Sequence, residues 1–191
     1  MDNNITAVIL CGGQSKRIGR NKAFLKIGNK PFVEILINKL QGLFQKIIIS
    51  TKQPTPYRHL KSAGISIVAD RSRVLGSLIG IYSALKKSPT KYIFVIAVDM
   101  PTIEPKLIKR LLTVRKKYDV VIPQTRKGLE PLCAVYSKEC LPHIVRQIRN
   151  DNYKIIDFFD QVRVKTIRLK KDGLFNVNTP KDYCHLRIEM S

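Results

Sequence analysis

The feature that most constrains the fold of this chain is a repeated order of short apolar runs and longer amphipathic segments. Residues 6–10 and 92–98 are apolar nearly throughout, without the polar–apolar alternation of a half-exposed strand. Such runs predict strands that are buried on both faces, as in a parallel sheet. Residues 31–44 instead repeat apolar side chains at helical spacing. The order of these elements predicts an α/β sheet with helices on both faces.

The same patterns continue along the chain. We predict further strands at residues 46–50, 65–69, 119–123, 132–136 and 162–169. We predict further helices at residues 57–63, 78–87, 105–117, 138–149 and 155–159, and from Pro180 onward. Gly64 follows the first of these helices and is predicted to be a left-handed cap. Residues 162–169 alternate apolar and basic side chains, which predicts an edge strand.

Ligands of open α/β sheets bind beyond the carboxyl ends of the strands. The segments that directly follow predicted strands are therefore the places where we expect chemistry. They are residues 11–22, Ser50, residues 70–77 and residues 99–101.

The first of these segments is a glycine-rich basic loop. Gly12 and Gly13 let the backbone bend and approach a ligand closely, and successive backbone N–H groups can form an anion-binding nest. Arg17 offers a fork for phosphate oxygens and Lys22 a compact positive charge. The loop predicts a triphosphate site, and a strand-to-helix turn with solvated basic residues stays open as an alternative. The Walker A and dinucleotide-binding spacings are absent.

The chain is strongly basic, with a formal net charge of +21. Its basic residues are spread along the sequence, with short lysine pairs but no long basic block. This distribution is more typical of a solvated surface than of a nucleic-acid interface. Such a surface would also attract polyphosphates. A nucleic-acid-binding protein remains the third hypothesis, behind two enzymatic ones.

Cysteine usage and hydropathy predict the compartment. Cys11, Cys133, Cys140 and Cys184 form no CxxC pair and no zinc-site spacing, so reduced, packed thiols are expected. The apolar start lacks preceding basic residues, and the other apolar runs are far too short to span a bilayer. We therefore expect a cytoplasmic protein without a membrane partner.

Four segments resemble a known family in the same order along the chain. The glycine-rich loop matches G-G-x-S-x-R-h-G-x-x-K, where h is apolar, and residues 99–101 read Asp-Met-Pro. Residues 129–136 contain Glu-Pro-Leu-x-Ala-x-Tyr, and residues 176–182 read Asn-x-Asn-Thr-Pro-x-Asp. Together they resemble the MobA-like nucleotidyltransferases over nearly the whole chain. The resemblance implies one Rossmann-like, three-layer α/β domain over residues 1–191, with a mostly parallel sheet and one late antiparallel strand.

The resemblance also implies roles for individual residues. Asp99 would hold Mg²⁺, in line with the preference of this ion for hard oxygen ligands. Arg17 and Lys22 would stabilise charge on the leaving pyrophosphate. Asn176 and Asn178 would lie on the acceptor side, although a role in capping a loop is open for both. The expected nucleotide contacts are Leu10, Cys11, Gly12, Gly13, Lys22, Ser50, Asp70 and Asp99.

The implied reaction transfers GMP from GTP to molybdopterin and releases pyrophosphate. Within the family, the Gly-Gly loop and Asp-Met-Pro accompany guanine rather than cytosine. The second hypothesis is a related nucleotidyltransferase that uses CTP or another phosphorylated acceptor. Transient contacts with other cofactor-biosynthesis proteins and with recipient molybdoenzymes are consistent with the implied function. Asn21, Ser50 and Ser77 depart from the Asp, Asn and Pro that are usual in the family.

Overall fold

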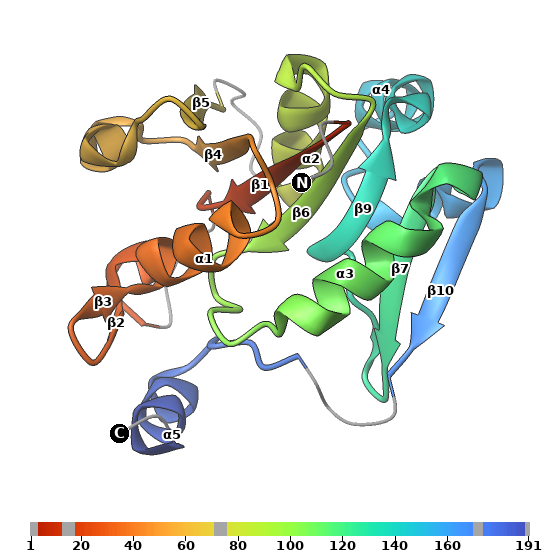
Figure 1. Cartoon of the computed structure of the whole chain (residues 1–191). Helices are drawn as coiled ribbons and strands as arrows, with labels where there is room; N and C mark the ends of the chain where they lie inside the picture. The colour runs from red at the N-terminus through yellow and green to blue at the C-terminus, as the bar shows by residue number, and fades with distance from the viewer. Residues whose placement is uncertain (1–3, 13–17, 71–75, 170–173, 190–191) are drawn as a thin grey trace.

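The computed structural model describes residues 4–12, 18–70, 76–169 and 174–189. Within these residues, one eight-stranded sheet has the order β10-β7-β9-β6-β1-β4-β5, and β8 pairs with β7 (Figure 1). The strands are β1 (Ile5–Leu10), β4 (Ile47–Thr51), β5 (Ile65–Ala69), β6 (Tyr92–Ala97), β7 (Val120–Thr125), β8 (Gly128–Leu129), β9 (Cys133–Ser137) and β10 (Val164–Arg168). The apolar run at the start of the chain is thus a central strand.

Strand direction confirms the expected fold class. β1 is parallel to both β4 and β6, β4 is parallel to β5, and β10 is parallel to β7. β9 lies between β6 and β7 and is antiparallel to both. It is the late antiparallel strand that the family resemblance implies. β10 ends the sheet on one side, as its alternating sequence predicts.

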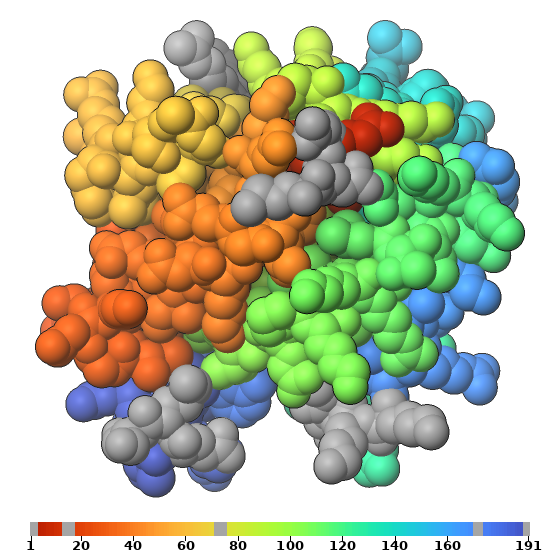
Figure 2. Space-filling model, viewed as in Figure 1, coloured from red at the N-terminus to blue at the C-terminus, as the bar shows by residue number. Residues whose placement is uncertain are grey.

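Helices on both faces of the sheet complete three layers. The helices are α1 (Phe32–Gln41), α2 (Ser77–Lys87), α3 (Pro105–Val114), α4 (Leu141–Arg149) and α5 (Pro180–Glu189). α1 and α3 share one buried apolar cluster with the inner side chains of the sheet, and they cover the front face in Figures 1 and 2. α2 and α4 share the cluster on the opposite face. Among the described helices, none is long and apolar enough to cross a bilayer.

Two short features differ from the sequence-based expectations. The predicted helix at residues 57–63 is a 3₁₀-helix, η2 (Thr55–Leu60), and Gly64 lacks the left-handed conformation of a cap. A Cβ at Gly64 would lie 3.0 Å from the Gln45 carbonyl oxygen, so close backbone approach explains the glycine. The hairpin of β2 (Lys26–Ile27) and β3 (Lys30–Pro31) was not predicted. Its signal is Gly28, which turns the chain with φ of 55°.

Other 3₁₀ segments join or extend these elements. Residues 115–117 and 138–140 were predicted as ends of longer helices, and apolar spacing alone does not distinguish a terminal α-helical turn from a 3₁₀ turn. Residues 155–159 were predicted as a separate helix and residues 22–24 were not predicted as helical, and all four segments are 3₁₀. The segments are η1 (Lys22–Phe24), η3 (Arg115–Lys117), η4 (Lys138–Cys140) and η5 (Ile155–Gln161).

Sheet register brings the three central strand ends level. Leu10 of β1 pairs with Ser50 of β4 on one side and with Ala97 of β6 on the other. The residues that follow these strands therefore leave the sheet at one edge. This is the edge where the sequence predicts the ligand.

Candidate active site

A cleft of about 410 Å³ opens at this edge of the sheet. Most of its lining comes from residues at or just beyond the carboxyl ends of β1, β4, β5 and β6, together with the start of α2. The lining residues are Leu10, Cys11, Gly12, Asn21, Lys22, Ser50, Thr51, Lys52, Asp70, Gly76, Ser77, Gly80, Ala97, Val98, Asp99 and Leu132. All of the expected nucleotide contacts that the structure describes are in this set.

Lys22 and Asp99 form an ion pair in the cleft. The Lys22 Nζ lies 2.9 Å from the Asp99 Oδ2 and donates a second hydrogen bond of 2.7 Å to the Asn178 Oδ1. The two charged side chains are 16% and 20% exposed, so the pair is partly desolvated but open to a ligand. Residues that are 77 and 156 positions apart thus meet at one ammonium group.

The segment that carries Asn178 is tied to the Asp99 turn. The Val177 N–H donates to the Asp99 carbonyl oxygen at 2.9 Å. The Asp182 carboxylate accepts from the N–H groups of Asn178 and Thr179 at 2.9 and 2.8 Å. These backbone hydrogen bonds, that from Asn178 first, lower the pKa of Asp182. The closing Asn-x-Asn-Thr-Pro-x-Asp motif is therefore a capping structure that presents Asn178 to Lys22.

Asn176 lies apart from this group. Its Oδ1 is buried and has no hydrogen-bond partner among the described residues, and Asn176 is not part of the cleft lining. The structure therefore brings Asn178, but not Asn176, to the ion pair.

Backbone hydrogen bonds to β4 on one side and to the residue after β6 on the other hold the chain where it leaves β1. The Cys11 N–H donates to the Ser50 carbonyl oxygen at 2.8 Å, and the Val98 N–H donates to the Leu10 carbonyl oxygen at 3.1 Å. A Cβ added at Gly12 would meet no atom within 4 Å among the described residues. The described residues leave this space open beside the cleft, as a ligand that approaches the backbone closely would require. Gly13 and Arg17 lie outside the described residues.

The first turn of α2 also lines the cleft. Gly76 precedes the helix, and Ser77 and Gly80 line the cleft. A Cβ at Gly80 would lie 3.1 Å from the Leu10 Cδ2, so glycine lets the helix pack closely on the end of β1. The amide groups at the start of an 11-residue helix favour an anion at this position.

The thiol in the cleft wall is unsuited to nucleophilic chemistry. Cys11 is 7% exposed. Burial raises the pKa of its thiol to about 12, against a smaller lowering effect of a hydrogen bond with Tyr57. A thiol with such a pKa stays protonated at neutral pH, which argues against Cys11 as a nucleophile.

Two carboxylates, Asp99 and Asp70, line the cleft. In the described part of the chain, no group of three or more His, Cys, Asp or Glu residues could hold a metal alone. A hard cation such as Mg²⁺ commonly takes one or two carboxylates together with substrate phosphates. The donor set of the cleft fits this mode of binding, and it does not fit an all-protein metal cage.

Two residues that support the site were not assigned a role from the sequence. Asn21 precedes Lys22 and caps the η1 turn, with its Oδ1 accepting from the Ala23 N–H at 3.1 Å. Lys39 of α1 donates to the carbonyl oxygens of Pro101 and Ile103 at 2.9 and 3.1 Å, which fixes the turn after Asp99. A lysine on an amphipathic helix is typical of a solvated face, so no sequence signal marks Lys39.

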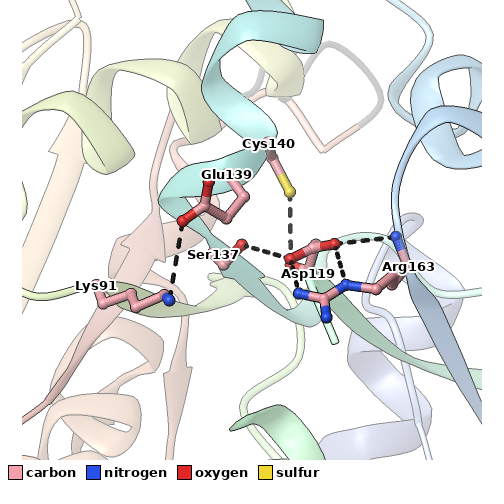
Figure 3. Close-up of polar contacts among 6 residues, drawn as sticks. All are labelled: Lys91, Asp119, Ser137, Glu139, Cys140 and Arg163. Carbon is pink, nitrogen blue, oxygen red and sulfur yellow. Dashed lines mark hydrogen bonds and ion pairs between the residues drawn. The ribbon is translucent and has the colours of Figure 1, made fainter. Parts of the chain in front are cut away.

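A second ion pair lies at the opposite end of the strands, where β7 and β10 begin (Figure 3). Asp119 precedes β7, and both of its carboxylate oxygens accept hydrogen bonds of 3.0 Å from the Arg163 guanidinium. The Arg163 N–H donates to the same carboxylate at 3.0 Å, and the Ser137 hydroxyl is 3.5 Å away. The Cys140 thiol donates to the Asp119 backbone carbonyl. This cluster joins the starts of β7 and β10 to the end of β9.

Comparisons with known proteins place this geometry in a family. The MobA-like NTP transferase domain matches residues 7–163. A probable molybdenum cofactor guanylyltransferase of Natranaerobius thermophilus is 36% identical over 95% of this chain and 94% of its own length. One of Pelotomaculum thermopropionicum is also 36% identical, over 96% and 92%.

A solved structure shares the fold. The molybdopterin-guanine dinucleotide biosynthesis protein A of Archaeoglobus fulgidus superposes with a TM-score of 0.82 at 24% identity, over 96% of this chain and 97% of that one. On the match of the family domain and the near full-length similarity of these relatives, the chain belongs to the MobA-like NTP transferase family.

Proposed function

We propose that the protein transfers GMP from GTP to the phosphate of molybdopterin, giving the guanine dinucleotide form and pyrophosphate. The observation that carries the proposal is the Lys22–Asp99 ion pair in a cleft at the strand ends. Its support is the full-length similarity to relatives named molybdenum cofactor guanylyltransferase. The Gly12-Gly13 and Asp-Met-Pro segments favour guanine as the base.

The reaction is an in-line displacement at phosphorus. An oxygen of the terminal pterin phosphate attacks the α-phosphorus of GTP, a new P–O bond forms, and the bond to the β-phosphate bridging oxygen breaks. Negative charge grows on that oxygen as pyrophosphate leaves. Positioning and charge stabilisation supply most of the catalysis in transfers of this kind.

The residues of the cleft have matching tasks. The Lys22 ammonium exchanges its contacts with Asp99 and Asn178 for phosphate oxygens and neutralises their charge. The backbone at Gly12 and the first turn of α2 supply N–H groups to the triphosphate. Arg17, from the same glycine-rich loop, adds a second cation. Asn176 and Asn178 are assigned to the acceptor side.

Asp99 is the residue that would hold Mg²⁺, together with phosphate oxygens of the substrate. When bound, Mg²⁺ supplies Lewis-acid stabilisation of phosphate charge. GTP and molybdopterin are then the small-molecule partners, and the cytoplasm is the compartment in which the enzyme works.

Pyrophosphate release from each of the four NTPs, with and without molybdopterin and with Mg²⁺ present, tests the proposal. We expect release with GTP that depends on both molybdopterin and Mg²⁺, and a guanylated pterin as product. Release with CTP in preference to GTP would contradict the assigned base. Release with a sugar phosphate or polyol phosphate, but not with molybdopterin, would favour the second hypothesis.

A further inference from the structure

A buried tyrosine hydroxyl lies directly behind the cleft. Tyr57, in η2, is 0% exposed. The Asn21 Nδ2 donates to its hydroxyl oxygen at 3.1 Å, and the same hydroxyl also has hydrogen-bond contacts with the Thr51 and Cys11 side chains, which line the cleft. The Tyr57 ring packs against Phe24 at a centroid distance of 5.1 Å, so Tyr57 contacts the residues at both ends of the η1 turn.

Asn21 transmits this contact to Lys22. Its amide nitrogen is used by Tyr57, and its Oδ1 accepts from the Ala23 N–H, so both ends of one side chain are held. Lys22 lies between Asn21 and Ala23 in the chain, and its Nζ lies 2.9 Å from the Asp99 Oδ2. A change in the orientation of the Asn21 amide therefore changes the turn from which Lys22 projects.

We infer that Tyr57 is a positioning residue for the transfer reaction, which acts through Asn21 to hold Lys22 on the triphosphate side of the cleft. The inference rests on the proposed function for the role of Lys22. It adds a residue from a different strand connection, after β4, that does not line the cleft. Loss of the hydroxyl removes the acceptor that orients the Asn21 amide, and because Asn21 is exposed, its amide can then turn to solvent.

The first test is steady-state kinetics of Tyr57→Phe and Asn21→Ala. We expect kcat to fall about tenfold in each, which is the size of effect that follows from one lost positioning hydrogen bond, with KM for GTP within about twofold. Asn21→Asp should recover most of this loss, because a carboxylate still accepts from the Ala23 N–H and can accept from the Tyr57 hydroxyl. If kcat stays at the wild-type value in both Tyr57→Phe and Asn21→Ala, the inference is wrong.

A double-mutant cycle with Lys22→Ala separates this inference from the proposed function. If Tyr57 acts through Lys22, Tyr57→Phe should cause no further loss in the Lys22→Ala background. A full tenfold loss in that background would overturn the inference. An unchanged rate in Lys22→Ala alone would instead contradict the proposed role of Lys22.

Thr6→Val is the matched control for the loss of a buried hydroxyl. Thr6 is 0% exposed, and its hydroxyl bonds the Thr90 hydroxyl at 2.9 Å near the start of β1, at the opposite end of that strand from the cleft. We expect a lower Tm and an unchanged kcat. If Tyr57→Phe folds poorly, Asn21→Ala carries the test, because Asn21 is an exposed residue. A kcat loss in Thr6→Val equal to that in Tyr57→Phe would show a general loss of stability and contradict the inference.

Discussion

The Lys22–Asp99 pair, at the carboxyl ends of the central strands, and the Asp119–Arg163 pair, at the starts of β7 and β10, are built differently. Asp119 has both carboxylate oxygens engaged by Arg163 and receives a backbone N–H bond as well. Asp99 shares one oxygen with Lys22, in a cleft of about 410 Å³. The Asp119 side chain is 10% exposed and the Asp99 side chain 20%.

The difference indicates what each pair does. A carboxylate whose lone pairs are used within the protein holds strands together and has little capacity left for a ligand. A lysine–aspartate pair on the wall of a cleft can exchange partners, because an ammonium group is a flexible point charge rather than a rigid fork. We therefore assign catalysis to the Lys22–Asp99 pair and stability to the Asp119–Arg163 pair. The same Asp→Asn change in each pair tests this assignment.

Asp99→Asn should have the largest effect. The substitution keeps the size of the side chain but removes the charge that would hold Mg²⁺ and pair with Lys22. We expect kcat/KM to fall by roughly a thousandfold, the upper range for loss of one charge-stabilising group. Thermal unfolding should change little, because the Lys22 Nζ keeps its hydrogen bond to the Asn178 Oδ1 and the new amide oxygen can accept from it in place of the carboxylate. Near wild-type turnover at saturating Mg²⁺ would show that Asp99 does not hold the metal.

Asp119→Asn should give the reverse pattern. The new amide places an NH₂ group against the Arg163 guanidinium, and the loss of charged hydrogen bonds should lower the free energy of unfolding, by an amount that solvent around the 68% exposed Arg163 side chain limits. Urea unfolding measures this loss. Turnover per folded molecule should stay within about twofold of wild type, and a larger drop would mean that the two pairs are coupled.

The pH dependence of stability sharpens the same comparison. Hydrogen bonds from the Arg163 side chain are the main reason that the pKa of the Asp119 carboxyl lies below its ordinary value, and burial opposes them. A carboxyl with a lowered pKa in the folded state stabilises the protein fully above its unfolded pKa of about 3.9. This stabilisation is lost as the pH falls through the lower, folded-state pKa. The Tm difference between wild type and Asp119→Asn should therefore be constant from about pH 5 to 7 and shrink below pH 4; a constant difference at low pH would contradict the account.

Lys91→Ala should have the smallest effect. The Lys91 Nζ lies 3.8 Å from the Glu139 Oε1 beside the Asp119 cluster (Figure 3). The two side chains are 51% and 63% exposed. Such a pair contributes about 0.5 kcal/mol or less. A loss in urea unfolding as large as that of Asp119→Asn would show that proximity to the cluster matters more than burial.

The sequence predicted the sheet better than its connections. The nearly all-apolar runs of β1 and β6 mark buried strands regardless of their neighbours, because few other environments accept them. The β2–β3 hairpin was not predicted, and the left-handed conformation predicted for Gly64 was wrong. Both depend on local backbone geometry, which composition and hydropathy do not encode strongly.

The site shows the same division. Lys22 and Asp99 follow strands or lie in motifs, so their residue types and places were sufficient to place both at the ligand end of the sheet, whereas their direct ion pair was not predicted. Tyr57 and Lys39 act on the site through one hydroxyl and two carbonyl contacts. Contacts of this kind depend on the packing of elements that are distant in sequence, and no spacing rule predicts them.

A crystal structure of the protein with GTP and Mg²⁺ tests the central claim most directly. The account predicts the triphosphate in the cleft, with phosphate oxygens about 3 Å from the Lys22 Nζ and from backbone nitrogens near Gly12, and the metal on the Asp99 carboxylate. An ordered nucleotide bound elsewhere, or a Lys22–Asp99 pair unchanged beside an empty cleft at saturating GTP, would contradict it.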